Sequence, residues 1–324
     1  MRLIIFLGFV LFSIASYATE LVKVSISGGA DVVSEELRVK IEKNATALIS
    51  AFNEAVFEGD NPDIDKKIRT KDLKQRVSEL WESSPIACID TLIEEKLMKL
   101  PGGGFQIRNI SVSLLSAPEG EQNQEVVLNF TDAGLIDNIQ FALDENRYKD
   151  IVSANISVRD FANRQVIVDF VENFRTAYNR KDIEYLKAVF SDDALIITGK
   201  VLKVKPYKSD IANRMSSERI MYVSQNKQQY MAGLERCFKR NKYIDVKFSD
   251  IEVLRHPVHD NIYGVTLKQD WKSSRYNDTG WLFLMIDFTD EYQPCIQVRT
   301  WQPEEFNGRK LSREEIFSLD KFNI

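Results

Sequence analysis

The sequence predicts an α+β protein of two domains, each with helices packed on a curved antiparallel sheet. Three observations lead to this prediction. The chain has 324 residues with 44% hydrophobic and 28% charged content, enough for about two globular domains. Hydrophobic residues first repeat with helical spacing and then with the spacing of two that is typical of strands. This change of period occurs once in each half of the chain.

The first residues predict export. A basic start is followed by an apolar run over residues 3–14 and by small residues at Ser16 and Ala18. This pattern is typical of a secretory signal cleaved after Ala18. The run is shorter than the ~20 residues that a membrane-spanning helix needs. We therefore expect residues 1–18 to be a signal peptide, and the mature protein to be secreted or periplasmic with no integral membrane segment.

Residues 19–150 predict a divergent N-terminal α+β domain. Its apolar spacing indicates two helices followed by a sheet, with Gly102, Gly103 and Gly104 forming a turn between two strands. A linker is expected over residues 151–163. The expected helices cover residues 37–56 and 73–81, and the expected strands cover residues 86–99, 105–115, 126–130 and 135–143.

Residues 164–305 predict the second domain with a clearer pattern. A long helix with one apolar face is followed by a short helix that Asp182 can cap, then by a strand and a third helix. Four strands joined by polar turns then form an antiparallel meander. The expected helices cover residues 164–179, 183–190 and 225–241, the strands cover residues 194–202, 244–254, 262–271, 281–288 and 296–301, and a C-terminal tail covers residues 306–324.

The opening of this second domain resembles a known family. Residues 170–182 read FVENFRTAYNRKD, and Leu186, Phe190 and the run Asp192-Asp193-Ala194 follow. This stretch is similar to the start of nuclear transport factor 2-like proteins, the cystatin-like cone fold shared with ketosteroid isomerase, scytalone dehydratase and SnoaL-like cyclases. The resemblance covers residues 164–302, and the first half resembles the same fold by element order. The whole chain is similar to exported bacterial proteins with tandem domains of this kind.

Common catalytic and metal-binding signatures do not occur in the sequence. Phosphate-binding, serine-hydrolase and zinc-protease motifs are missing. The two histidines, His256 and His259, could hold a metal with Asp260, although we favour a polar turn between strands. The net charge of −5 gives no basic footprint for nucleic acid. We expect no cofactor, no metal and no nucleic-acid partner.

The three cysteines do not form a disulfide scaffold. Cys88, Cys237 and Cys295 each have apolar neighbours, so buried free thiols are the default interpretation. A bridge between Cys237 and Cys295 stays open as an alternative.

The last three strands contain the candidate binding residues. A hairpin centred near Tyr276 would place Trp271 opposite Trp281 and Val265 opposite Asp287, on a face that Arg299 shares. Large aromatic residues with a few polar groups are what a ligand cavity requires. The resemblance adds Tyr178, because cone enzymes pair a carboxylate base with a tyrosine or acid that stabilises the oxyanion. The predicted ligand-binding set is Tyr178, Gln269, Trp271, Trp281, Asp287, Arg299 and Trp301.

Two interpretations of this face remain open. It could line a pocket, or Trp271 and Trp281 could simply stabilise the hairpin while Asp287 and Arg299 form a buried ion pair. An arginine beside Asp287 would lower the pKa of that carboxyl and weaken it as a base. We therefore expect a non-catalytic protein that binds a small apolar ligand or a cell-envelope partner, with homodimerisation through a sheet face as a further option. The alternative is an isomerase, cyclase or dehydratase that uses Asp287 and Tyr178.

Overall fold

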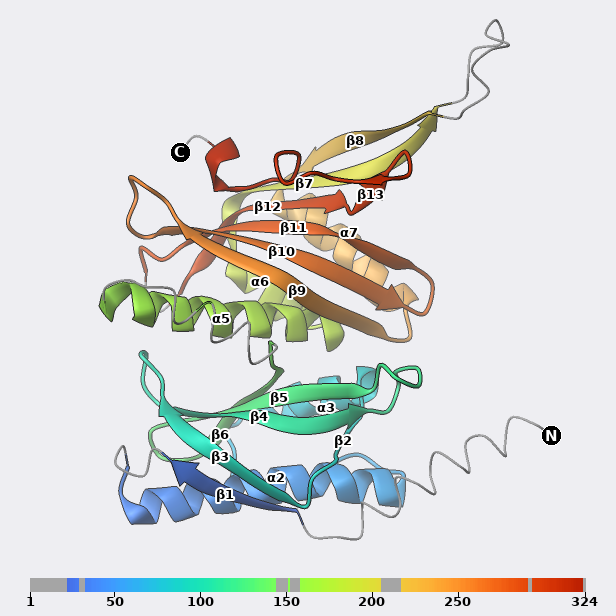
Figure 1. Cartoon of the computed structure of the whole chain (residues 1–324). Coiled ribbons are helices and arrows are strands. Elements are labelled where there is room, and N and C mark those ends of the chain that lie inside the picture. Colours follow the sequence, from blue (N-terminus) through green and yellow to red (C-terminus); the bar gives the residue numbers. More distant parts are fainter. Residues whose placement is uncertain are drawn as a thin grey trace, which may run out of the picture. The chain divides into compact units, whose positions relative to one another are not determined.

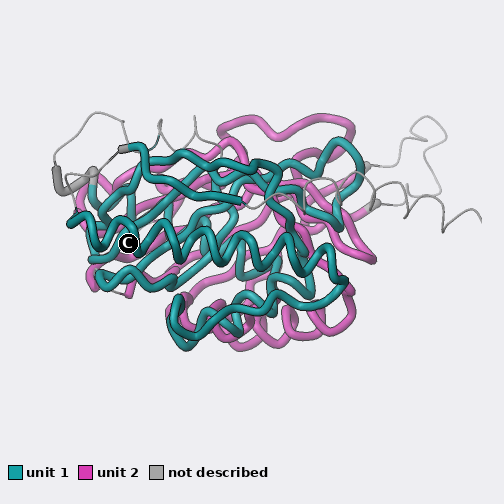
Figure 2. The backbone as a smooth tube through the Cα atoms, turned by 90° about the horizontal axis from the view of Figure 1, so that it is seen from below, with its two compact units in different colours: residues 1–180 teal, residues 181–324 magenta. Residues whose placement is uncertain are grey.

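The computed structural model describes residues 22–28, 33–143, 151, 158–204, 217–290 and 293–322 of the chain. The predicted signal peptide and residues 152–157 of the predicted linker lie outside these residues. The chain divides into two compact units, Met1–Arg180 and Lys181–Ile324, which are coloured separately in Figure 2. Because the division falls at Arg180, the long helix that precedes it is counted with the first unit.

The first unit contains a six-stranded sheet (Figure 1). Its order is β1-β3-β4-β5-β6, and β2 also pairs with β4. The predicted strand over residues 86–99 is two strands, and β1 pairs in parallel with β3. The sheet consists of β1 (Lys23–Gly28), β2 (Ile86–Cys88), β3 (Leu92–Lys99), β4 (Phe105–Leu114), β5 (Asn123–Phe130) and β6 (Ile136–Phe141).

Helices α2 (Glu35–Glu58) and α3 (Leu73–Ser83) cover one face of this sheet. The Ser34 side chain accepts a hydrogen bond from the Leu37 amide and so begins α2. Gly59 ends α2 in the left-handed conformation, with φ of 71°. Alternate strand residues meet these helices in one apolar core, which includes Leu48, Phe52, Val77, Ile107, Leu128 and Ile139. The same alternation turns the intervening strand residues to the opposite face, where α5 (Val158–Asn179) makes its contacts.

The second unit has its own six-stranded sheet, with the order β8-β7-β12-β11-β10-β9. The pair β12 and β7 is parallel, and the meander from β9 to β12 is antiparallel as predicted. Strand β8 was not predicted, and it lies almost entirely between the predicted strand over residues 194–202 and the predicted helix over residues 225–241. The strands are β7 (Phe190–Val204), β8 (Ser217–Gln225), β9 (Ile244–Arg255), β10 (Ile262–Ser273), β11 (Asn277–Asp287) and β12 (Cys295–Pro303).

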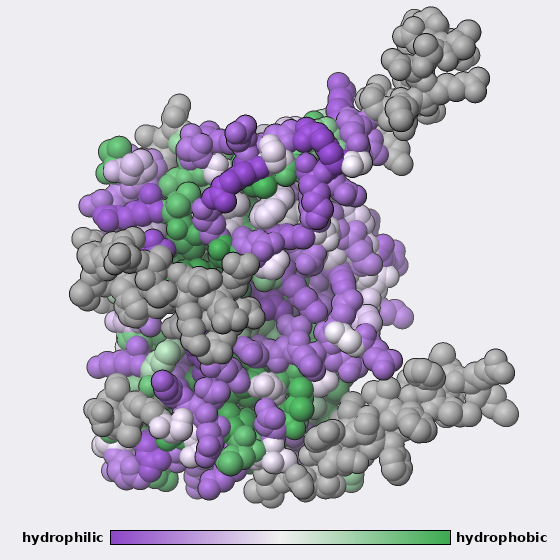
Figure 3. Space-filling model, viewed as in Figure 1, coloured by the Kyte–Doolittle hydropathy of each residue, from purple (hydrophilic) through white to green (hydrophobic). Residues whose placement is uncertain are grey.

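Two helices and a C-terminal segment complete the second unit. Helices α6 (Ile183–Val189) and α7 (Lys227–Arg240) pack against each other and against β7. A small hairpin of β13 (Glu305–Phe306) and β14 (Arg309–Lys310) follows β12, and the short helix η2 (Leu319–Lys321) lies near the end. Hydrophilic residues cover most of the face seen in Figure 3, with hydrophobic patches between them.

The predicted α+β class with two domains is confirmed, because each unit has helices packed on a sheet. Each sheet contains one parallel pair, so the sheets are mixed rather than purely antiparallel. Within the described ranges, the helices do not reach the length and apolar character that crossing a membrane demands.

Candidate functional site

The register of the β10–β11 hairpin differs from the one that the sequence predicted. Trp271 pairs with Asp278 rather than with Trp281, and Lys268 is the residue opposite Trp281. The turn therefore lies closer to Ser274 and Arg275 than to Tyr276. Because the pairing slips by three residues, an odd number, β11 presents the opposite set of side chains to each face.

This slip separates the predicted binding residues. Gln269, Trp271, Arg299 and Trp301 share one face of the second sheet, as their pairing partners show. We call it the helix face, because the Arg299 guanidinium lies 4.9 Å from the ring centre of Tyr230 on α7. Trp281 and Asp287 project from the other face, together with Phe283 and Met285.

Asp287 and Arg299 therefore do not form the face-sharing pair that the sequence suggested. The Asp287 carboxylate accepts hydrogen bonds from the Thr289 amide at 2.8 Å and from its hydroxyl at 2.6 Å. Gln297 also donates to it at 3.5 Å. These contacts tie Asp287 to the polar turn that follows β11, which is not an apolar enclosure.

Tyr178 lies on α5 and belongs to the first unit. Its side chain is buried and packs edge-on against Phe174, with ring centres 5.0 Å apart. On the helix face of the second sheet, the strand centres are filled by aliphatic side chains that are 0% exposed: Val265, Leu267, Leu282, Leu284 and Ile286. At these positions the predicted cavity wall is packed core.

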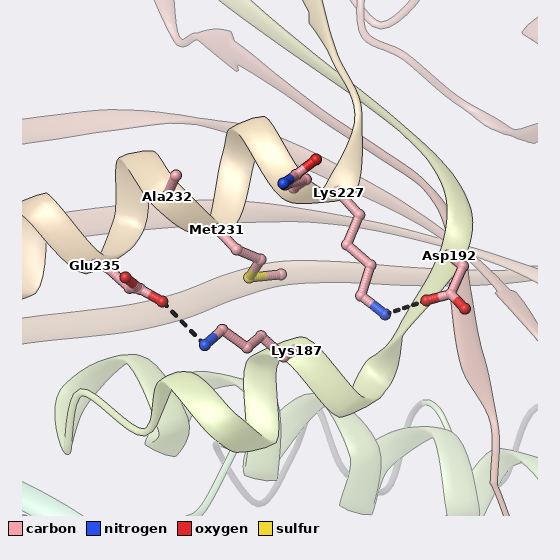
Figure 4. A pocket seen from close by; sticks show the side chains of 7 residues that line it. Lys187, Asp192, Lys227, Met231, Ala232 and Glu235 are labelled. Atoms are coloured by element: carbon pink, nitrogen blue, oxygen red, sulfur yellow. Dashed lines mark hydrogen bonds and ion pairs between the residues drawn. The ribbon is translucent and has the colours of Figure 1, made fainter.

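A groove between α6 and α7 in the second unit combines apolar and charged side chains (Figure 4). Its volume is about 510 Å³, within the range of small-molecule sites. Met231 and Ala232 on α7 provide its apolar part, with Met231 nearly buried. The lining residues are Lys187, Asp192, Lys227, Gln228, Met231, Ala232 and Glu235.

Two ion pairs cross this groove. Lys187 on α6 binds Glu235 on α7 at 2.9 Å, and Lys227 at the start of α7 binds Asp192 on β7 at 2.8 Å. Each pair lowers the pKa of its carboxyl, chiefly through the hydrogen bond from the lysine. Because Asp192 is 96% exposed and Glu235 is 38% exposed, these bonds compete with water and are weak. A bound ligand can replace either partner at little cost.

Local sequence signals hold both helices of the groove in place. The Asp182 side chain accepts from the Tyr185 amide and begins α6, as the sequence predicted. Asn226 and Gln229 form a reciprocal capping box at the start of α7. The side chains of Asp182 and Asn226 therefore accept hydrogen bonds from backbone amides that could otherwise bind an anion. The sequence analysis missed the groove, although α7 shows its signal: positions 227, 228, 231, 232 and 235 lie on one helical face.

The first unit contains a buried polar network that the sequence analysis also missed. Asp169 on α5 accepts hydrogen bonds from Gln106, Asn129 and Gln140, at 3.2, 3.2 and 2.9 Å. Arg108 and Glu172 form an ion pair beside it. Burial raises the pKa of the Asp169 carboxyl, and the amide donors act in the opposite direction. The alternation of polar and apolar residues in QIR of β4 and NIQ of β6 is the signal that could have revealed this second packed face.

His256 has the structural role of a turn residue. Its Nδ1 accepts hydrogen bonds from the amides of Val258 and His259, at 3.1 and 3.0 Å. The described part of the chain contains no group of three or more His, Cys, Asp or Glu side chains that could hold a metal ion.

Comparisons with known proteins concern the fold. No family model matches the chain. It is similar to a nuclear transport factor 2-like protein from Cytophaga hutchinsonii, with 15% identity over 46% of this chain and 99% of that one, and a TM-score of 0.32. A protein of the same type from Shewanella oneidensis has 13% identity over 42% of this chain and 94% of that one, with a TM-score of 0.28. A naphthalene 1,2-dioxygenase chain has 8% identity over 52% of this chain and 93% of that one, with a TM-score of 0.35.

Proposed function

We propose that the chain is an exported, non-catalytic binding protein whose second unit holds its ligand in the groove between α6 and α7. The observation that carries this proposal is the groove itself, which joins an apolar wall to charges of both signs. That combination suits an amphipathic ligand, either a small molecule or a short segment of a cell-envelope protein. Export rests on the signal-peptide pattern of residues 1–18.

The packing of the second unit supports a site outside the sheet rather than inside it. The central helix-face positions of β10 and β11 are 0% exposed, so these strands offer no lined cavity at their centres. The groove lies on the outer surface of two helices, where both ion pairs can exchange with solvent. Met231 would supply an adaptable apolar contact for whatever enters.

The alternative of an isomerase, cyclase or dehydratase loses its proposed base in this structure. Asp287 lies beside a polar turn and accepts two hydrogen bonds from Thr289. An apolar cone would have to isolate such a carboxylate for it to take a proton efficiently at neutral pH. Tyr178, the proposed oxyanion partner, lies on a helix that belongs to the first unit.

Native mass spectrometry of the chain purified from its own compartment tests the proposal. We expect a reproducible adduct or a bound partner, lost in Ala232→Trp because the indole fills the groove. Gly233→Trp is the matched control, because it places an indole at the next residue, where a Cβ atom would have only Arg236 Nη2 within 4 Å, at 3.9 Å. Equal loss in both variants, or an adduct that survives Ala232→Trp, would place binding elsewhere.

A further inference from the structure

The face of the second sheet opposite the helix face carries an apolar patch. Its members come from three neighbouring strands, and each is 8% exposed or less: Ile262 on β10, Phe283 and Met285 on β11, and Val298 on β12. An apolar area on the outside of a sheet must be covered to be stable in water. In this chain the residues that cover it come from the C-terminal segment.

Three apolar residues of this segment pack on the patch. Leu319 belongs to the same cluster and is 6% exposed, and Phe317 and Phe322 pack against it. The Phe322 ring stacks on Phe283 with ring centres 5.3 Å apart, and Phe317 meets Tyr222 of β8 edge-on at 5.4 Å. We call residues 311–322 the cap.

Polar contacts fix the cap to the sheet. The Gln302 side chain, 1% exposed, accepts from the Phe317 amide at 2.7 Å and donates to the Glu315 carbonyl at 3.0 Å. It thereby satisfies two backbone groups of the cap, as a neighbouring strand would. Arg309 adds a bidentate ion pair with Glu315, at 2.7 and 2.6 Å.

The sheet residue below the cap is a glycine. A Cβ atom at Gly264 would lie 2.9 Å from Cβ of Leu319 and 3.0 Å from the Phe283 ring. The absence of a side chain at Gly264 lets the cap approach the strand closely. The cap therefore fits the sheet at several residues, through the close approach at Gly264, the hydrogen bonds of Gln302 and the ring stacking on Phe283. A loosely attached tail would not make such contacts.

We infer that residues 311–322 are an intramolecular cap that closes this sheet face and prevents the chain from associating with itself through it. The patch that the cap covers is an area that a second sheet could pack against face to face. The segment expected from the sequence as a tail is thus part of the second unit's packing. Dimerisation through this face requires the cap to leave first.

Hydrogen exchange and sedimentation velocity on the full chain test this inference. We expect Leu319→Ser to speed exchange at the Phe317 amide by at least about tenfold, because a buried leucine contact is lost. We also expect its sedimentation coefficient to rise with concentration. Asp320→Ser changes the exposed neighbour and should behave as the wild type. Adding Met285→Gln to Leu319→Ser should reverse the association by making the uncovered patch polar.

Phe322→Ser provides a second variant if Leu319→Ser fails to fold, because Phe322 lies at the end of the described chain and loses ring contacts with Phe283 and Phe317 rather than a fully buried position. The inference is overturned if the folded variants keep the wild-type exchange rate at Phe317, or if exchange quickens without concentration-dependent association. It is also overturned if the wild type already forms a dimer that protects Met285.

Discussion

Arg108 on β4 and Glu172 on α5 form a buried ion pair in the first unit, with Nη1 of the arginine 3.0 Å from Oε2 of the carboxylate. Their side chains are 7% and 0% exposed. Glu172 also accepts from the Leu143 amide at 2.7 Å and from Gln140 at 3.1 Å. Helix α5 therefore meets this sheet through hydrogen bonds and charge, whereas α2 and α3 meet the other face through apolar side chains.

Arg108→Met should destabilise the protein by about 3–5 kcal/mol, because it leaves the Glu172 carboxylate buried without its cation. Urea unfolding followed by circular dichroism measures the change. Glu172→Gln with Arg108→Met removes both charges and should recover part of the loss. A single variant within about 1 kcal/mol of the wild type would show that the pair contributes little.

Asp169 should make stability depend on pH. Burial raises the pKa of its carboxyl in the folded state, so the folded protein retains this proton at a pH where the unfolded chain has lost it. The stabilising effect of the proton is complete below the unfolded pKa of ~3.9 and disappears as the pH rises through the higher folded pKa.

Asp169→Asn, which cannot titrate, should remove this dependence. The free energy of unfolding of the wild type, minus that of the variant, should fall steadily from pH ~4 upward and then level off above the folded pKa. Urea titrations at a series of pH values give the difference. A difference that stays constant with pH would contradict the assignment. Asp169→Asn also places an amide NH2 group where the Asn173 amide now donates to the Asp169 carboxylate. The stability lost through this mismatch should be independent of pH.

The three cysteines should react as free thiols at different rates. All three are unpaired in the structure, and Cys88 is buried. Burial raises the pKa of the Cys88 thiol to about 11, so at pH ~8 about one Cys88 in a thousand is the reactive thiolate. Iodoacetamide should modify the partly exposed Cys237 and Cys295 first, and Cys88 mainly after unfolding. Mass spectrometry of timed digests checks the order, and a Cys237–Cys295 disulfide in the purified protein would contradict it.

Gly280 should not tolerate a side chain. A Cβ atom there would lie 2.2 Å from the Gln302 carbonyl oxygen and 2.6 Å from the Trp301 indole. We expect Gly280→Ala to cost about 1–3 kcal/mol through overpacking. Gly102→Ala is the control, because nothing lies within 4 Å of its Cβ position. Thermal melts of the two variants should differ by several degrees, and equal melting temperatures would contradict the close packing of Trp301 on β11.

Local patterns in the sequence determined most of the helices and the β9–β12 meander. The Asp182 cap and the helical spacing over residues 225–241 each describe neighbours along the chain, and such signals survive without knowledge of the fold. The alternation of the last strands could not give the register, because both faces of residues 281–286 carry large apolar side chains and either face could therefore meet the helices.

Tertiary structure decided which side chains meet. Trp281 and Asp287 lie on the face opposite the predicted one, because the register differs by three residues from the predicted register. Gln302 binds the backbone of a C-terminal segment that the sequence predicted only as a tail. The groove between α6 and α7 depends on the packing of two helices that are more than thirty residues apart. The sequence by itself determined the α+β class and the local elements, since these depend on short-range periodicity. The site and the cap arise from long-range contacts, which no local pattern encodes.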